Sequence, residues 1–280
     1  MGKLVPGSDG LPAEEVGKWV EEKHFFVTEY IKLSHGARLQ FIGPRHAGAA
    51  YIDLFCGPGQ GRIKGTKQYV DGAAVAAWNT AKERGSPFTA MYIADRDEVR
   101  RDHCATRLRK LGAPVFEIRG SALEAVRELL TMLPAQGLHF AFLDPYSLGS
   151  LSFDLLASLA KFQRMDILVL ISAMDLFRNI DQQSTDEAGE FDEFAPAWRE
   201  HVPIGLPQTE RRATVMRYWA WRVRMELGLN SSSDMHPVTN SVNRLIYWLL
   251  LLHRHKLAEK FWKIVLKGRP QRTQEMSFDD

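Results

Sequence analysis

The pattern of apolar and polar residues divides most of the chain into short apolar runs separated by amphipathic stretches. Continuous apolar runs, which predict buried strands, occur at 49–55, 90–95, 114–118, 139–144, 166–172 and 245–252. Apolar residues at helical spacing predict helices over about 13–33, 71–84, 98–111, 123–133, 153–162, 210–227 and 257–266. Strands that alternate with helices are typical of a mostly parallel α/β sheet with helices on both faces.

The ends of the chain and one internal region depart from this alternation. Residues 1–12 are rich in Gly and Pro, and residues 267–280 are polar, so both are predicted to be flexible tails. The remainder, 13–266, is predicted to be a single domain with an N-terminal helix. Within it, residues 173–240 interrupt the alternation and carry an acidic stretch, which predicts an inserted region of helices and loop that acts as a lid.

Composition narrows the function classes only slightly. The chain has 280 residues, of which 45% are hydrophobic and 25% charged, and its formal net charge of +2 neither requires nor excludes a nucleic-acid partner. Two cysteines are too few for a disulfide scaffold or a cysteine-rich zinc site, and we predict no metal site. With no signal peptide and no apolar run long enough to cross a bilayer, the sequence predicts a cytoplasmic protein without a membrane partner.

A glycine-rich loop, YIDLFCGPGQGRIKG, follows the first apolar strand. It lacks the G-x-x-x-x-G-K-[ST] of a P-loop, and its G-x-G-x-G spacing misplaces the third glycine of a dinucleotide-binding loop. Its D-x-x-x-G-x-G pattern resembles motif I of the class I S-adenosylmethionine-dependent methyltransferases. The resemblance implies a Rossmann-like core in which Asp53, Phe55, Gly57 and Gly59 bind the methyl donor. Such a ligand carries no phosphate, so a carboxylate in the loop is tolerated and Asp53 can pair with its amino group.

The next two strand ends carry polar residues in the order that this resemblance leads us to expect. Asp95 follows the second strand, where an acidic residue in the family takes both ribose hydroxyls. Ser121 follows the third strand, where the family often has Asp or Ser facing the adenine amine. Ser121 is equally explained as the N-cap of the following helix, as is Asp97 after Asp95.

The fourth strand ends in Asp144-Pro145-Tyr146, which resembles the [DNS]-P-P-[YFW] motif of methyltransferases that act on exocyclic amines of nucleobases. A carboxylate and a backbone carbonyl that accept both N–H bonds of such an amine aim its lone pair at the methyl group. An aromatic ring stacking on the base contributes about 1–3 kcal/mol. This sequence has one proline fewer than the motif, so the ring of Tyr146 is shifted by one position. A strand-terminating turn remains the alternative explanation for Asp-Pro-Tyr.

Taken together, the motifs resemble one family, the three-Cys-motif partner proteins (TcmP). The resemblance spans roughly residues 15–266 and includes Trp19 and Lys23 of the first helix, YIDLFCGPGQ, YIADRD, AFLDPYSLG and the FAPAW segment. It implies S-adenosyl-L-methionine as cofactor, S-adenosyl-L-homocysteine as product, and a partner protein with three cysteines. The predicted function is N-methylation of an amine on a nucleobase, nucleoside or small metabolite, with Asp144, Pro145 and Tyr146 as catalytic residues. Asp144 is also predicted to contact the cofactor. The alternative is a non-catalytic nucleotide-binding module that acts through the partner.

Overall fold

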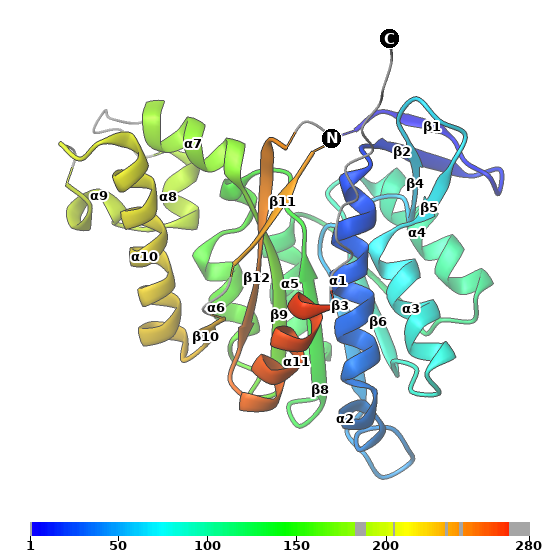
Figure 1. Cartoon of the computed structure of the whole chain (residues 1–280). Helices are drawn as coiled ribbons and strands as arrows, with labels where there is room; N and C mark the ends of the chain where they lie inside the picture. The colour runs from blue at the N-terminus through cyan, green and yellow to red at the C-terminus, as the bar shows by residue number, and fades with distance from the viewer. Residues whose placement is uncertain (1, 183–188, 204, 233–234, 241–242, 269–280) are drawn as a thin grey trace.

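The computed structural model describes residues 2–182, 189–203, 205–232, 235–240 and 243–268, which form two sheets with covering helices (Figure 1). The strands are β1 (Leu4–Pro6), β2 (Pro12–Val16), β3 (Ala49–Asp53), β4 (Gln60–Ile63), β5 (Tyr69–Asp71), β6 (Ala90–Ala94), β7 (Val115–Ile118), β8 (Leu138–Leu143), β9 (Met165–Ser172), β10 (Asn230–Ser231), β11 (His236–Thr239) and β12 (Leu245–His253). The α-helices are α1 (Trp19–Leu33), α2 (His35–Leu39), α3 (Ala73–Glu83), α4 (Glu98–Lys110), α5 (Ala122–Met132), α6 (Phe153–Leu159), α7 (Ala173–Gln182), α8 (Glu190–Phe194), α9 (Trp198–His201), α10 (Gln208–Leu227) and α11 (Lys256–Lys267), and a 3-10 turn, η1, covers Leu148–Ser150.

The main sheet has, in the described part of the chain, the strand order β10-β12-β9-β8-β3-β6-β7, with β11 also paired to β12. Strand β3 is parallel to both β6 and β8, whereas β12 runs antiparallel to β9. The chain moves outward from β3 through β6 and β7, and then returns to the other side of β3 with β8 and β9. This order, with the antiparallel β12 between β9 and β10, is that of the class I methyltransferase fold, so the predicted fold class is confirmed. The order reverses between β3 and β8, and open α/β sheets bind their ligands at such a point.

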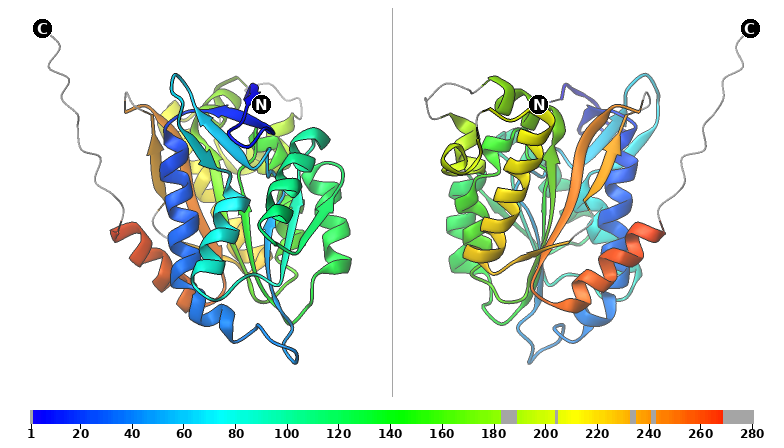
Figure 2. Two further views of the ribbon diagram at one scale, coloured as in Figure 1. Left: turned by 90° about the vertical axis from the view of Figure 1, so that its right-hand side faces the viewer. Right: turned by 60° about the vertical axis from the view of Figure 1, so that its left-hand side comes forward.

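Helices cover both faces of the main sheet and enclose two hydrophobic cores (Figure 2). Because successive side chains of a strand point to opposite faces, Ile52 of β3 packs in one core and Tyr51 in the other. The first core lies under α5, α6, α7 and α10, and the second lies under α1, α3, α4 and α11. The sheet is therefore buried on both sides, and the chemistry is left to its edge at the strand ends.

The predicted strands of this sheet, and the helices that connect them, have boundaries within a few residues of the observed ones. The predicted N-terminus of one helix, α3, is wrong. Helix α3 was expected to begin at Asp71, whereas its N-cap is Gly72. Asp71 is the last residue of β5 and pairs with Gln60 of β4. The residues between the glycine loop and α3, for which the apolar pattern predicts no strand, thus form a β-hairpin.

The N-terminal residues also differ from the prediction. Residues 4–16 form β1 and β2, and with β4 and β5 these make a separate small sheet in the order β1-β2-β4-β5, seen to the right of the upper end of α1 in Figure 1. The predicted flexible tail over 1–12 is therefore wrong for the residues described, and helix α1 begins at Trp19 instead of Ala13. The glycine and proline content reflects a tight turn, since Gly10 has a φ of 83° between the paired residues Pro6 and Pro12. We call residues 2–16 the N-terminal strap.

The inserted region predicted over 173–240 is largely helical where it is described, with α7, α8, α9 and α10 lying together at one side of the main sheet (Figure 1). Residues 183–188, which hold part of the acidic stretch, lie outside the described residues. Most of the predicted C-terminal tail, 269–280, also lies outside them, and α11 extends to Lys267.

Candidate functional site

A cavity lies where the strand order reverses, at the carboxyl ends of β3 and β8. Its volume is about 70 Å³. The predicted site residues that line it are Asp53, Phe55, Gly57, Gly59 and Asp144. The strap and helix α1 contribute further polar residues, namely Glu14, Lys23 and His24. One cavity therefore joins the glycine loop, the acidic residue before it and the first residue of the Asp-Pro-Tyr motif.

The glycine loop has a backbone that only glycine adopts without strain. Gly57 and Gly59 have φ angles of 56° and 81°. A Cβ atom on Gly59 would lie 3.0 Å from the Cα of Cys104 on α4. A Cβ atom on Gly72, the N-cap of α3, would lie 2.7 Å from the Cα of Gly59. The loop is thus packed tightly between α3 and α4, with its backbone exposed to the cavity.

Asp53 is a buried carboxyl group, 1% exposed, at the end of β3. It accepts a hydrogen bond of 3.1 Å from the Phe55 N–H and one of 3.4 Å from the Tyr51 hydroxyl. Burial raises the pKa of Asp53 to about 7, and the nearby Asp144 carboxylate adds to this rise, while the Phe55 N–H and the Lys23 ammonium oppose it. A cation bound in the cavity would stabilise the ionised form of Asp53.

Asp95 follows β6 and is also 1% exposed. Its Oδ2 accepts a hydrogen bond of 2.9 Å from the Gly57 N–H, and its Oδ1 accepts one of 2.9 Å from the Asp97 N–H. Burial raises the pKa of Asp95, and these two N–H groups act against the rise. Asp95 thus fixes the glycine loop relative to α4, whose N-cap is Asp97 as predicted.

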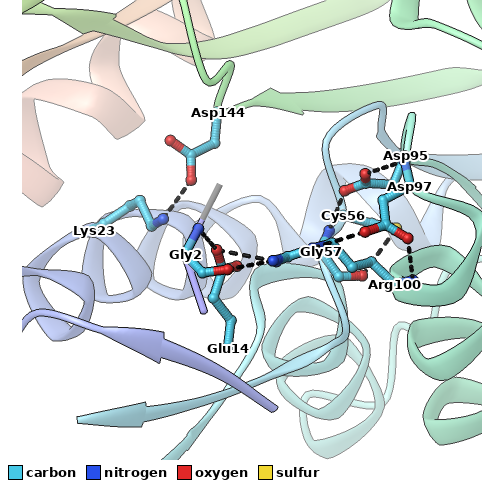
Figure 3. Close-up of polar contacts among 9 residues, drawn as sticks. All are labelled: Gly2, Glu14, Lys23, Cys56, Gly57, Asp95, Asp97, Arg100 and Asp144. Carbon is cyan, nitrogen blue, oxygen red and sulfur yellow. Dashed lines mark hydrogen bonds and ion pairs between the residues drawn. The ribbon is translucent and has the colours of Figure 1, made fainter. Parts of the chain in front are cut away.

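Asp144 follows β8 and forms an ion pair with Lys23 of α1, which is shown in Figure 3. The side chains of Lys23 and Asp144 are 14% and 22% exposed, so the pair lies at the surface of the cavity. Pro145 and Tyr146 continue the motif, and Tyr146 is 41% exposed. Burial of its hydroxyl raises the pKa of Tyr146, and the carboxylates of Asp95 and Glu14 are the next contributions. Tyr146 is therefore close enough to Asp95 and Glu14, as well as to Asp144, for their charges to act on its hydroxyl.

Ser121 does not join the other predicted site residues around the cavity. Its hydroxyl accepts a hydrogen bond from the Glu124 N–H, and the Glu124 side chain accepts one from the Ser121 N–H. This capping box at the start of α5 is sufficient to explain why a serine occupies position 121. The contacts of Ser121 are thus those of the predicted helix N-cap.

Several polar residues of the site had little or no sequence signal. Lys23 belongs to the first helix of the family resemblance, but nothing indicated its contact with Asp144. His24 follows it, forms no hydrogen bond with any described residue, and has a pKa lowered by burial and by the Lys23 charge. Glu14 lies at the start of the stretch 13–33, which was predicted to be a helix. Burial raises the pKa of Tyr247 on β12, and the nearby charge of Asp144 adds to that rise. Their roles depend on tertiary contacts that no local pattern encodes.

Two further features concern the rest of the structure. A larger, mostly apolar cavity of about 500 Å³ lies between α7, α10, β10 and β12, and the predicted site residues do not line it. In the part of the chain that is described, no three His, Cys, Asp or Glu side chains gather as they would around a metal ion. Among the same residues, no helix has the length and apolar character needed to span a membrane.

Comparisons with known proteins give likenesses of fold at low identity. No protein-family model matches the chain, and no curated protein matches it. A putative O-methyltransferase from Klebsiella pneumoniae is 14% identical, with a TM-score of 0.48 over 88% of this chain and 84% of that one. A Legionella pneumophila protein with the family model DUF519 is 12% identical, with a TM-score of 0.47 over 88% and 92% of the two chains.

A third similar structure is geranyl diphosphate C-methyltransferase from Streptomyces coelicolor A3(2), in complex with Mg²⁺, geranyl diphosphate and S-adenosyl-L-homocysteine. It is 11% identical, with a TM-score of 0.37 over 79% of this chain and 78% of that one. At these identities the likenesses assign neither a family nor an activity, and membership of the three-Cys-motif partner family stays a hypothesis.

Proposed function

We propose that the protein is an S-adenosyl-L-methionine-dependent methyltransferase, with S-adenosyl-L-homocysteine as the product. The observation that carries this proposal is the single cavity at the reversal of strand order. It is lined by Asp53, the glycine loop and Asp144. Asp95 is tied to the same loop through Gly57. Three carboxyl groups, those of Glu14, Asp53 and Asp144, line the cavity together with the ammonium group of Lys23. This excess of acidic groups disfavours the phosphates of a nucleotide or dinucleotide.

The charges of the cavity suit a cationic ligand without phosphate. S-adenosyl-L-methionine carries an ammonium and a sulfonium group against one carboxylate, so its net charge is positive. Asp53 would hold the ammonium group, and Gly57 and Gly59 would let the loop backbone approach the ligand. When bound, the cofactor supplies a methyl group activated by the sulfonium. Asp53, Gly57 and Gly59 line one cavity, and the chemistry of these residues suits this cofactor.

For the methyl acceptor, we propose an amine on a nucleobase, nucleoside or small metabolite. Asp144 would accept an N–H of the amine, which holds the nitrogen lone pair toward the methyl group. This requires Asp144 to exchange its ion pair with Lys23 for the acceptor. Tyr146, which is partly exposed beside it, offers a ring face for stacking.

The alternative is a binding module that holds the cofactor without transferring its methyl group and acts through a partner protein with three cysteines. The ion pair between Lys23 and Asp144 favours it, because the carboxylate that would orient an acceptor already has a partner. Methyl transfer and cofactor binding are separable measurements, so the two functions can be distinguished.

The first test is calorimetric titration of the purified protein with S-adenosyl-L-methionine and S-adenosyl-L-homocysteine. The proposal expects saturable binding of both. If the protein binds neither compound, both the methyltransferase and the binding module are contradicted. Where binding is found, transfer of a radiolabelled methyl group to nucleosides, RNA, DNA or a three-cysteine protein supports the enzyme. Binding without transfer to any of these favours the module.

A further inference from the structure

We propose that Glu14 of the N-terminal strap is part of the methyl-donor site and accepts a hydrogen bond from a ribose hydroxyl of the donor. This inference rests on the proposed function and adds a residue from outside the main sheet to it. The resemblance in the sequence gave the ribose to Asp95 alone. The contacts of Asp95 and Glu14, drawn in Figure 3, favour Glu14 as a ligand of the ribose.

Asp95 is already committed to the protein backbone. Each of its two oxygens accepts an N–H at 2.9 Å, one from Gly57 and one from Asp97, and the side chain is 1% exposed. Each of these oxygens can accept a further hydrogen bond. Asp95 does not line the cavity, however, so a ribose could reach its oxygens only if the glycine loop or the start of α4 moved away, and each buried N–H released in this way carries a desolvation cost. Asp95 is therefore better suited to shaping the loop than to holding the ribose by itself.

Glu14 lies on the other side of Gly57 and faces the cavity. Its Oε1 accepts a 2.7 Å hydrogen bond from the Gly2 N–H and lies 3.0 Å from Nη1 of Arg100. Its Oε2 has no hydrogen-bond partner among the described residues, and lies 3.5 Å from where a Cβ atom on Gly57 would be. Glu14 thus presents an open acceptor oxygen directly beside the glycine loop, across Gly57 from Asp95.

Two buried arginines of α4 fix the strap in this position. Arg100 pairs with Glu14 and donates a hydrogen bond to the carbonyl of Gly2. Arg107 donates to Asp9 and to the carbonyls of Leu11 and Pro12 on the strap, and also to the carbonyl of Pro58 in the glycine loop. The side chains of these arginines are 4% and 5% exposed. The strap is therefore a built wall of the cavity, joined to the glycine loop by a common arginine.

The cavity as described is smaller than the donor. Its volume of about 70 Å³ is well below the roughly 300–1,000 Å³ of pockets that hold drug-sized ligands. Gly2 donates its N–H to Glu14, and its carbonyl accepts a hydrogen bond from Arg100 (Figure 3). Displacement of Gly2 by the donor would leave Glu14 Oε1 paired with Arg100 at 3.0 Å, so Oε2 is the oxygen available to the ligand. A ribose hydroxyl then binds Glu14 Oε2, and the strap closes over the nucleoside.

The test compares Glu14→Gln with Glu15→Gln by titration calorimetry. Glu15 is the next residue of the strap, pairs with Arg62 at 2.9 Å and does not line the cavity, so it is a matched control. The probes are S-adenosyl-L-homocysteine and 5′-methylthioadenosine, which keeps the ribose but lacks the amino acid. We expect Glu14→Gln to weaken binding of both probes by about tenfold or more, as for loss of one charge-assisted hydrogen bond. Glu15→Gln should bind both probes as the parent does.

The other outcomes overturn the inference in distinguishable ways. If the parent binds neither probe, this inference fails together with the proposed function. If the parent binds and Glu14→Gln binds equally well, only the role of Glu14 fails. Weaker binding of S-adenosyl-L-homocysteine with unchanged binding of 5′-methylthioadenosine would place Glu14 at the amino acid and contradict the ribose assignment.

A second measurement needs no variant and guards against misfolding of Glu14→Gln. Hydrogen exchange of the strap amides, residues 3–16, is measured in the parent with and without S-adenosyl-L-homocysteine. We expect the ligand to slow exchange across the strap, because closure over the nucleoside stabilises it. Exchange that is unchanged at saturating ligand would contradict the closure and with it the position given to Glu14.

Discussion

Asp95 and Asp144 follow two strands, β6 and β8, that flank the same central strand β3, yet their carboxylates are held in different ways. Asp95 is enclosed, and both of its oxygens accept backbone N–H groups. Asp144 is 22% exposed and its partner is the Lys23 side chain on the first helix. A carboxylate bound by the backbone cannot change partners without deforming the loop, whereas one bound by a flexible lysine can. The first is part of the scaffold of the site and the second is available for chemistry.

The largest effect is expected from Asp95→Ala. The substitution leaves the buried N–H groups of Gly57 and Asp97 without acceptors, at about 1–3 kcal/mol each. We expect the free energy of unfolding to fall by about 4 kcal/mol, measured by urea denaturation, and binding of S-adenosyl-L-homocysteine to be lost with the shape of the glycine loop. Asp97→Ala, which removes the cap of α4 and a 3.3 Å contact with Arg100, should cost about 1 kcal/mol. Equal losses in the two variants would mean that Asp95 is not the scaffold residue described here.

This difference between the two residues was not visible in the sequence, although their positions were. Three of the apolar runs, those of β3, β6 and β8, have an acidic residue at or near their end, and the ends of parallel strands meet at one edge of a sheet. Local pattern therefore predicts that Asp53, Asp95 and Asp144 lie at this edge, as the structure shows. The partners of these residues come from Gly57, Phe55 and Lys23, which are set by loop conformation and by packing of the first helix. Local periodicity carries no information on such contacts.

The N-terminal strap shows the same limit for the fold. The alternating strands and helices of the main sheet have strong apolar periodicity, because their burial on both faces demands it. Strands β1 and β2 are short and lie in a small sheet whose residues are mostly only half-buried, so their periodicity is weak. What holds them is the set of contacts made by Arg100 and Arg107 on α4, roughly 90 residues later in the chain. Composition therefore predicts a flexible tail, whereas the structure has a strap that lines the cavity.

The next effect in size is expected from Asp144→Asn, which keeps the shape of the side chain and removes its charge. Asp144, unlike Asp95, can exchange its partner Lys23 for the methyl acceptor. We therefore expect methyl transfer to fall by about 100-fold or more, while the affinity for S-adenosyl-L-homocysteine stays within about twofold of the parent. Radiolabelled transfer and calorimetry measure the two quantities on one preparation. Lys23→Met is the companion variant, since it removes the partner and leaves Asp144 itself in place. If Asp144→Asn instead unfolds the protein or loses the ligand, Asp144 belongs to the scaffold as Asp95 does.

Asp53, on β3 between the two, combines both kinds of contact and predicts a dependence on pH. Its pKa of about 7 in the folded protein lies above the value near 3.9 of an unfolded chain. As the pH rises from about 4 to 7, the unfolded chain loses this proton first, so this group lowers the free energy of unfolding across that window and has no further effect above it. A positively charged ligand prefers the ionised carboxylate. The affinity for S-adenosyl-L-methionine should therefore rise by roughly tenfold between pH 6 and 8.

The variant Asp53→Asn isolates this contribution, because asparagine does not titrate. Calorimetry at pH 6, 7 and 8 should show the rise in affinity for the parent and little of it for the variant. The comparison is needed because His24 acts in the opposite sense on stability. Its pKa is lowered in the folded protein, so its contribution is present above pH 6.5 and is lost as the pH falls. A parent and variant with the same pH profile would show that another group controls ligand binding.

The smallest effect is expected from Ser121→Ala, at the end of the outermost strand of the same edge, β7. Its hydroxyl belongs to a capping box with Glu124, and the loss of such a cap costs about 1 kcal/mol of stability. We expect urea denaturation to show that loss and calorimetry to show unchanged affinity for S-adenosyl-L-homocysteine, since Ser121 does not line the cavity. Ser121→Thr, which retains a capping hydroxyl, should restore most of the stability. A loss of affinity in Ser121→Ala without a change in stability would instead return Ser121 to the adenine, and would show that the nucleoside extends beyond the strap to the edge of the sheet.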